Sequence, residues 1–196
     1  PMITSVSEVE EASRLLKQAY FEVAEEQGCA VGVNLFQPQL GVMIEVPAAI
    51  YQLPMLASKV DFFSVGSNDL TQYLLAVDRN NRRVASLYDA YHPAVLASLD
   101  EIARRCEELG KPVSVCGELA GDPGGALLLV AMGYRQLSMN SYNIDRVRWI
   151  LRNVRSSTLQ VMLAKALQAR RPEQVRSMIS EKMESMGLGG FVRAGK

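Results

Sequence analysis

The sequence predicts an α/β fold built on four parallel strands, and its pattern of apolar residues is the reason. Four short, nearly continuous apolar runs recur along the 196 residues, and each leads into a segment of helical periodicity. Such runs are typical of strands that are buried on both faces of a parallel sheet. Strands that alternate with helices imply right-handed crossovers between parallel neighbours.

A long amphipathic helix is expected before the first strand, over residues 5–27. Ser5 and Glu8 have capping-box spacing, and Gly28 ends the pattern. The three-four repeat of apolar residues predicts a buried face made of Val9, Ala12, Leu15, Leu16, Ala19, Tyr20 and Val23. Residues 29–40, which include Cys29, are expected to form a connection.

The remaining elements alternate regularly. Strands are expected at residues 41–46, 61–66, 112–116 and 136–139, and helices at 48–58, from Asp69, from Pro93 to Leu109, from Pro123 to Gly133 and over 143–186. A polar loop is expected over 78–89, and Trp149 is expected to pack in the core. We expect one domain over residues 1–186, followed by a flexible tail over 187–196 that is rich in glycine.

Composition excludes several classes of function. Lysine and arginine total 21 and aspartate and glutamate total 21, so the chain has no basic excess with which to bind nucleic acid. No apolar run approaches the ~20 residues that a membrane-spanning helix needs. Three widely spaced cysteines do not resemble a disulfide framework, so we expect a location in the cytoplasm.

Polar residues end each predicted strand. If the strands are parallel neighbours, their carboxyl ends form one rim, where α/β folds place their chemistry. Glu45 stands among apolar neighbours and is either a metal ligand or the partner of an unseen basic residue. Asp69 is either the cap of the next helix, with Asn68 beside it, or a second ligand. Two carboxylates on a rigid rim suit Mg²⁺.

Three further residues have competing interpretations. Arg79 is either a solvated loop residue or a clamp for a phosphate or carboxylate that reaches over the rim. Cys116 is either a small apolar residue or a reactive thiol at the end of the third strand, whereas Cys106 is expected to be an inert core residue. His92 precedes Pro93 at a helix start and is expected to be a cap or a loop residue rather than a catalyst.

As a set, these motifs resemble the C-terminal domain of Enzyme I, the phosphoenolpyruvate-protein phosphotransferase of the bacterial phosphotransferase system. The motifs are Gly41-Val-Met-Ile-Glu-Val-Pro-Ala48, Asp61-Phe-Phe-Ser-Val-Gly-Ser-Asn-Asp-Leu-Thr-Gln-Tyr73, Leu75-Ala-Val-Asp-Arg79 and Val115-Cys-Gly-Glu-Leu-Ala-Gly-Asp122. Their order matches, and the resemblance extends from Pro1 to about residue 185. Segments such as Tyr51-Gln-Leu-Pro54 resemble the nitrogen-regulatory branch of the family rather than the sugar-transport branch.

The resemblance implies a (βα)₈ barrel that binds phosphoenolpyruvate and Mg²⁺ at its C-terminal rim and releases pyruvate. Glu45 and Asp69 match the Mg²⁺ ligands, and Asn68 and Asp69 match the pair that contacts phosphoenolpyruvate. Arg79 matches an arginine that binds the same substrate. Cys116 matches the general acid that protonates the enolate of pyruvate.

The family delivers the phosphoryl group to a histidine on an N-terminal domain, and from there to a small phosphocarrier protein (HPr or its nitrogen-branch counterpart). Pro1-Met-Ile-Thr4 resembles the exit from the fourth barrel strand, so we expect these residues to form the second half of the barrel. The isolated half should be inactive, and its unpaired edges should favour a homodimer. The alternatives are a dikinase-type phosphoenolpyruvate synthase and a module that senses phosphoenolpyruvate or mediates dimerisation without turnover.

Overall fold

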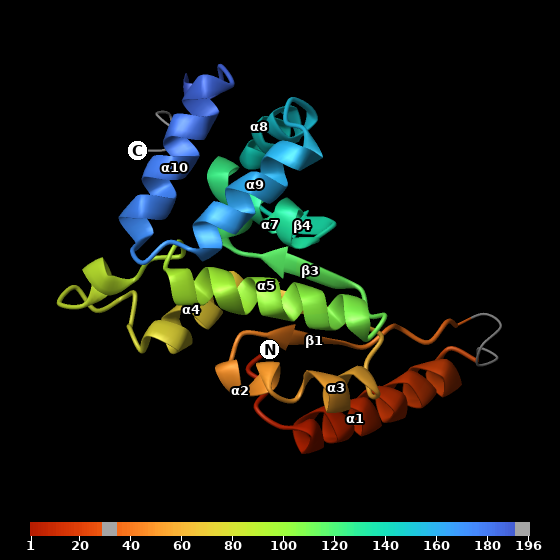
Figure 1. The fold of residues 1–196 in the computed structure, drawn as a ribbon. Helices are drawn as coiled ribbons and strands as arrows, with labels where there is room; N and C mark the ends of the chain where they lie inside the picture. Colours follow the sequence, from red (N-terminus) through yellow and green to blue (C-terminus); the bar gives the residue numbers. More distant parts are fainter. Residues whose placement is uncertain (29–34, 191–196) are drawn as a thin grey trace.

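Four strands form one parallel sheet in the order in which they occur along the chain (Figure 1). The computed structural model describes residues 1–28 and 35–190. The strands are β1 (Gly41–Ile44), β2 (Phe62–Gly66), β3 (Val113–Cys116) and β4 (Gln136–Ser138). Helical segments connect each strand to the next, so the predicted α/β fold of consecutive parallel βα units is confirmed.

Helices account for most of the other described residues. The segments up to β3 are α1 (Val6–Glu26), α2 (Pro47–Ile50), α3 (Leu53–Ala57), α4 (Ser67–Leu75), the 3₁₀ turn η1 (Ala85–Leu87) and α5 (Pro93–Glu108). After β3 come α6 (Glu118–Gly121), α7 (Pro123–Met132), α8 (Ser141–Arg152), α9 (Ser156–Leu167) and α10 (Pro172–Ser185). None of the helices in this described part is long and apolar enough to cross a membrane.

The core lies on one face of the sheet. Ile44, Phe63, Val65 and Val115 point to this face and are fully buried. They form a single cluster with apolar residues of α5, α7, α9 and α10. Helix α7 is buried almost all round because α5, α8 and α9 all pack against it (Figure 1).

The opposite face of the sheet is only half-buried, so the prediction that the strands are buried on both faces is wrong. Met43 and Phe62 alternate with the core residues and retain solvent exposure. On the same face the Ser114 hydroxyl donates to the Ser64 hydroxyl at 3.1 Å. The reason is that the helices of the described chain gather on the other side, and no described element covers this face.

Helix α1 begins after Ser5 as predicted, and the Glu8 carboxylate accepts from the Ser5 backbone N–H at 2.9 Å. Its predicted buried face is only partly correct, because Val9 and Tyr20 are buried but Leu15 is 50% exposed. The helix packs mainly on the short helix α3, which is too small to cover that face.

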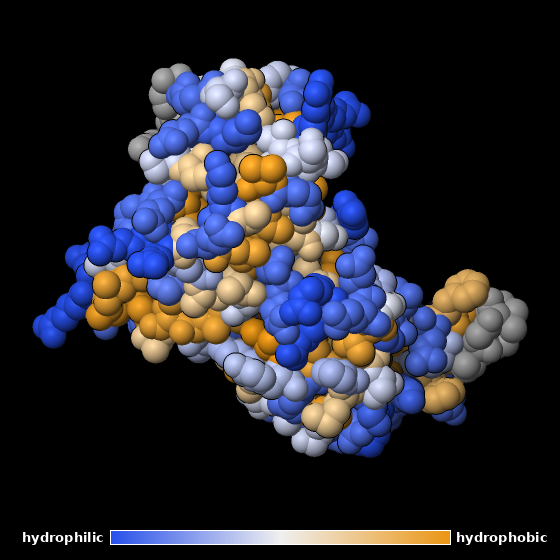
Figure 2. Space-filling model, in the orientation of Figure 1, coloured by the Kyte–Doolittle hydropathy of each residue, from blue (hydrophilic) through white to orange (hydrophobic). Residues whose placement is uncertain are grey.

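One other expectation about an apolar residue differs from the structure. Trp149 is 48% exposed on α8, so its predicted place in the core is wrong. Leu87 is also exposed, and Figure 2 shows apolar surface along α4 and the loop that follows it. At the end of the chain Leu188 is buried against the core, and the flexible tail over 187–196 stays a prediction.

Candidate functional site at the carboxyl ends of the strands

The pairing register places the ends of all four strands along one rim. The register of β1 against β2 puts Glu45, the residue after β1, beside Gly66 at the end of β2. Gly66 pairs with Cys116, and Cys116 pairs with Ser138 of β4. The structure therefore brings the predicted carboxylate and the predicted thiol onto the same edge of the sheet.

Three hydrogen bonds join the end of β2 to the turn after β3. The Ser67 hydroxyl donates to the carbonyl of Cys116 at 2.8 Å, and the Cys116 thiol donates to the carbonyl of Val65 at 3.4 Å. The Glu118 backbone N–H donates to Asn68 Oδ1 at 3.1 Å. These bonds fix the thiol relative to the first turn of α4, although about fifty residues separate the two segments along the chain.

Gly117 makes this junction possible. Its φ of +113° belongs to a region that residues with a side chain rarely adopt. A Cβ atom at this position would lie 2.3 Å from the Ser67 hydroxyl oxygen and 3.0 Å from Asn68 Oδ1. The glycine thus supplies both the backbone conformation and the space that the three bonds require.

Asn68 and Asp69 do not cap α4, so that alternative from the sequence is wrong. The helix begins at Ser67, with Gly66 as its N-cap, and Asp69 lies within the first turn. The Asn68 side-chain oxygen accepts from the Glu118 backbone N–H, so the NH₂ group of Asn68 points away from Glu118. The Asp69 carboxylate instead pairs with Arg79, as described below.

Glu45 is a buried carboxylate, only 3% exposed. Its Oε1 accepts from the backbone N–H of Met2 at 2.5 Å, and its Oε2 lies 2.7 Å from the point that a Cβ on Gly66 would occupy. Within residues 1–28 and 35–190, no lysine or arginine pairs with it. The interpretation that Glu45 pairs with a basic residue is therefore not supported in this part of the chain. A buried carboxylate that accepts from a single backbone N–H is costly unless a positive charge lies near it.

Arg79 reaches back over α4 from the loop that follows it. Ala76 adopts a left-handed conformation (φ +52°) at the end of α4, which reverses the chain. The Arg79 backbone N–H then donates to Gln72 Oε1 at 3.2 Å, and its Nη2 lies 3.2 Å from Asp69 Oδ1. Its Nη1 is buried, and among the described residues it has no hydrogen-bond partner. The interpretation of Arg79 as a purely solvated residue is therefore wrong.

Tyr88 is a rim residue that the sequence analysis did not identify. Its hydroxyl donates to the backbone carbonyl of Asn68 at 3.2 Å and so holds the loop between α4 and α5 against the start of α4. Burial raises the pKa of this hydroxyl, and the nearby Thr71 and Arg79 side chains partly oppose that rise. A loop tyrosine carries no sequence signal for such a contact, because the contact depends on how the chain folds back.

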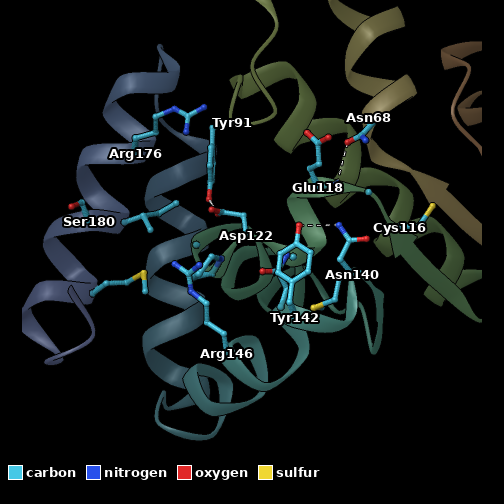
Figure 3. A pocket seen from close by; sticks show the side chains of 18 of the residues that line it. Asn68, Tyr91, Cys116, Glu118, Asp122, Asn140, Tyr142, Arg146, Arg176 and Ser180 are labelled. Atoms are coloured by element: carbon cyan, nitrogen blue, oxygen red, sulfur yellow. Dashed lines mark hydrogen bonds between the residues drawn. The ribbon is translucent and has the colours of Figure 1, made fainter. Parts of the chain in front are cut away.

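A cleft of about 1110 Å³ opens beside Cys116, between α6, α8 and α10 (Figure 3). Side chains from all three helices line it, including Arg146 of α8 and Arg176 of α10. Arg176 lies 4.7 Å above the ring of Tyr91 and pairs with Asp89 at 2.6 Å. The Tyr91 hydroxyl donates to Asp122, which also caps α7; this network anchors α10 to the rim. None of these residues had been assigned a role from the sequence.

Cys106 and His92 behave as the residue patterns predict. Cys106 is fully buried in α5, and burial raises the pKa of its thiol to about 12, so it stays protonated and inert at neutral pH. Cys116 is half-buried. The His92 Nδ1 accepts from the Ala94 backbone N–H at 3.2 Å, which confirms its capping role. Cys29 lies outside the described residues.

Glu45 and Asp69 are the two carboxylates that the sequence places at the rim as candidate metal ligands. No cluster of three or more histidine, cysteine, aspartate or glutamate side chains with metal-binding geometry occurs in the described chain. Glu45 and Asp69 therefore supply at most two carboxylates. That number suits Mg²⁺, which keeps water ligands and takes further oxygens from a phosphorylated substrate.

Residues 1–156 match the family model of the PEP-utilising enzymes, PEP-binding domain. The chain is 46% identical over 195 residues to a Salmonella typhimurium protein named "Phosphoenolpyruvate-dependent phosphotransferase system", covering 100% of this chain and 26% of that protein. It is 39% identical over 181 residues to the "Phosphoenolpyruvate-protein phosphotransferase" of Haemophilus influenzae, covering 92% of this chain and 31% of that protein.

The solved structures add a likeness of fold. A citrate lyase from Burkholderia xenovorans superimposes with a TM-score of 0.53 at 18% identity, covering 95% of this chain and 63% of that one. At this identity the likeness concerns the fold alone.

These findings define a domain of the α/β class built on a four-stranded parallel sheet. The chain belongs to the family of PEP-utilising enzymes, in their PEP-binding domain. It spans about a quarter of the length of the curated relatives that it matches over its whole length.

Replacing Gly117 by alanine should destabilise the fold. We expect Gly117→Ala to lower the free energy of unfolding by about 2 kcal/mol or more, because it combines backbone strain with a clash. Gly110→Ala is the matched control, since Gly110 also has a positive φ (+63°) but nothing within 4 Å of its absent Cβ. Urea unfolding measures both variants, and equal losses would contradict the role given to Ser67 and Asn68 in this turn.

Proposed function

We propose that this chain is the phosphoenolpyruvate-binding part of a longer cytoplasmic phosphotransferase. In this proposal the enzyme takes the phosphoryl group from phosphoenolpyruvate, transfers it through a histidine on another domain to a small phosphocarrier protein, and releases pyruvate. The family match over residues 1–156 supports it, as do the names of relatives such as those from Salmonella and Haemophilus. The likeness of Tyr51-Gln-Leu-Pro54 to the nitrogen-regulatory branch favours that branch over sugar uptake.

One observation carries the assignment of the substrate to the rim. Arg79 Nη1 is a buried donor without a partner among the described residues, while Nη2 of the same guanidinium is held by Asp69. An unpaired buried donor is costly unless a ligand accepts from it. An arginine that is fixed through one nitrogen and open at the other suits a phosphate or carboxylate oxygen.

Glu45 and Asp69 would hold Mg²⁺ at this rim. When bound, the metal supplies positive charge that balances the buried Glu45 carboxylate and the developing charge of the substrate. Asp69 can serve both partners, because Arg79 occupies only its Oδ1.

The other rim residues would bind the substrate and supply a proton. Arg79 and the Asn68 NH₂ group bind and orient phosphoenolpyruvate, and their charge and dipole stabilise the enolate left when the phosphoryl group departs. Cys116 provides the proton for the methylene carbon of that enolate, which makes pyruvate and drives the transfer forward. Its half-buried position limits competition from water.

Removing the proton donor tests the reaction. In the full-length protein that carries this segment, Cys116→Ala should lower Mg²⁺-dependent pyruvate release from labelled phosphoenolpyruvate by about a hundredfold or more. Cys106→Ala is the control, because that thiol is buried away from the rim and inert. Absence of carrier labelling by the unmodified protein, with and without Mg²⁺, would instead favour a sensing module without turnover.

Arg79→Lys tests the substrate clamp. We expect the KM for phosphoenolpyruvate to rise roughly ten- to a hundredfold, because lysine keeps the charge but loses the two-pronged donor. Arg83→Lys in the same loop is the control, since Arg83 is exposed and should leave KM within a factor of about two. Equal KM values for the two variants, measured in the same transfer assay, would remove Arg79 from the substrate site.

We also propose that the chain forms a homodimer. Within the described residues β1 and β4 each have one unpaired edge, and the sheet face that carries Met43 and Phe62 is half-exposed. Such edges favour pairing with a second copy. Sedimentation of this 196-residue chain at roughly tens of micromolar should show a dimer. Gln136→Lys, a charge on edge strand β4, should shift it toward monomer; a wild-type chain that stays monomeric contradicts the proposal.

A further inference from the structure

The proposed chemistry requires the Cys116 thiol to lie at a fixed place relative to the substrate residues of α4. Neither strand alone can ensure this, because Cys116 ends β3 whereas Asn68 and Asp69 follow β2. The parallel ladder fixes the position of Cys116, which pairs with Gly66 and Ser138, but not the rotamer of its thiol or the direction of its carbonyl. Hydrogen bonds outside the ladder hold these two groups.

Ser67 is the side chain placed to do this. It is 1% exposed, one of three buried polar or charged residues in the described core, together with Glu45 and Thr71. Its hydroxyl donates to the Cys116 carbonyl at 2.8 Å, and its own carbonyl accepts from the Thr71 hydroxyl at 2.7 Å. Ser67 thus joins the backbone of the thiol residue to the second turn of α4.

The space around this hydroxyl is closely defined. The Ser67 hydroxyl oxygen fits here because Gly117 has no side chain, and a Cβ atom at position 117 would clash with it. The Cys116 thiol is held from the other side by the Val65 carbonyl at 3.4 Å. The Cys116 carbonyl and thiol are both held by the segment that leads into Asn68, so loss of the Ser67 hydroxyl frees the Cys116 carbonyl and leaves the thiol with its bond to the Val65 carbonyl alone.

We propose that Ser67 is a positioning residue that holds the Cys116 thiol over one face of the substrate's methylene carbon. This inference rests on the proposed function, because it presumes that phosphoenolpyruvate binds at the rim. In the reaction, the P–O bond breaks as the phosphoryl group passes to the acceptor nitrogen. The electron pair of the enolate then forms a C–H bond with the thiol proton, and the resulting thiolate regains a proton from water.

A fixed thiol delivers its proton to a single face, whereas water protonates a free enolate from both. The test uses (Z)-phosphoenolbutyrate, whose receiving carbon carries a methyl group, in deuterated water with the full-length protein. The product, 2-oxobutyrate, is reduced as it forms, and NMR measures the ratio of its two deuterated C3 epimers. We expect one epimer from the wild type and a ratio near 1:1 from Ser67→Ala, with the KM for phosphoenolpyruvate changed by less than about threefold.

Ser114→Ala is the matched control. It removes a serine hydroxyl from β3 two residues before Cys116, but that hydroxyl bonds to Ser64 within the sheet and not to the turn. The control should keep the single epimer. Ser67→Thr, which retains a hydroxyl, should restore it. A single epimer from Ser67→Ala, or mixed epimers from both alanine variants, overturns the inference.

A second measurement needs no turnover. The rate at which iodoacetamide alkylates Cys116, read from its peptide by mass spectrometry, should rise at least about threefold in Ser67→Ala and stay unchanged in Ser114→Ala, because a released thiol is more accessible. Equal rates overturn the positioning role even if the reaction proceeds. If the unmodified protein transfers nothing from phosphoenolpyruvate, the proposed function fails, and the alkylation rates still decide whether Ser67 holds the thiol.

Discussion

The turn after β3 exists in its observed form only because residue 117 has no side chain. The positive φ of Gly117 directs the chain so that the Cys116 carbonyl meets the Ser67 hydroxyl and the Glu118 N–H meets Asn68. With any larger residue these bonds compete with a steric clash. The relation between the thiol and the first turn of α4 therefore follows from one backbone conformation, and the rim chemistry depends on that relation.

The two carboxylates of the rim differ in burial and in charge balance, and this difference suggests a different role for each. Asp69 is partly solvated and already paired with Arg79, so its charge is balanced within the described chain. Glu45 is buried and receives a single backbone N–H, from Met2. A cation placed between them would gain most from Glu45 and would leave the guanidinium of Arg79 in place. This arrangement supports the proposal of Mg²⁺ and phosphoenolpyruvate as joint ligands.

Much of the fold could be predicted because its causes are local. Apolar runs and prolines at helix starts, such as Pro93 and Pro123, each act within a few residues, and the structure has them as predicted. The errors arose where burial depends on distant partners. Trp149 is 48% exposed on α8, and the strands have only one covered face because the helices of the described chain gather on that face.

In the candidate site, too, features with local causes could be predicted and features that depend on distant contacts could not. Glu45, Asp69 and Cys116 were predicted to share a rim, and the parallel register places their strand ends together. Ser67 was expected on the rim but was given no role, and Tyr88 was given none, because the sequence near each shows only a small or aromatic residue without periodicity. Their function arises from bonds to residues twenty or fifty positions away. Sequence thus indicates which groups carry chemistry, whereas the contacts that hold those groups in place emerge only when the two turns meet in the folded chain.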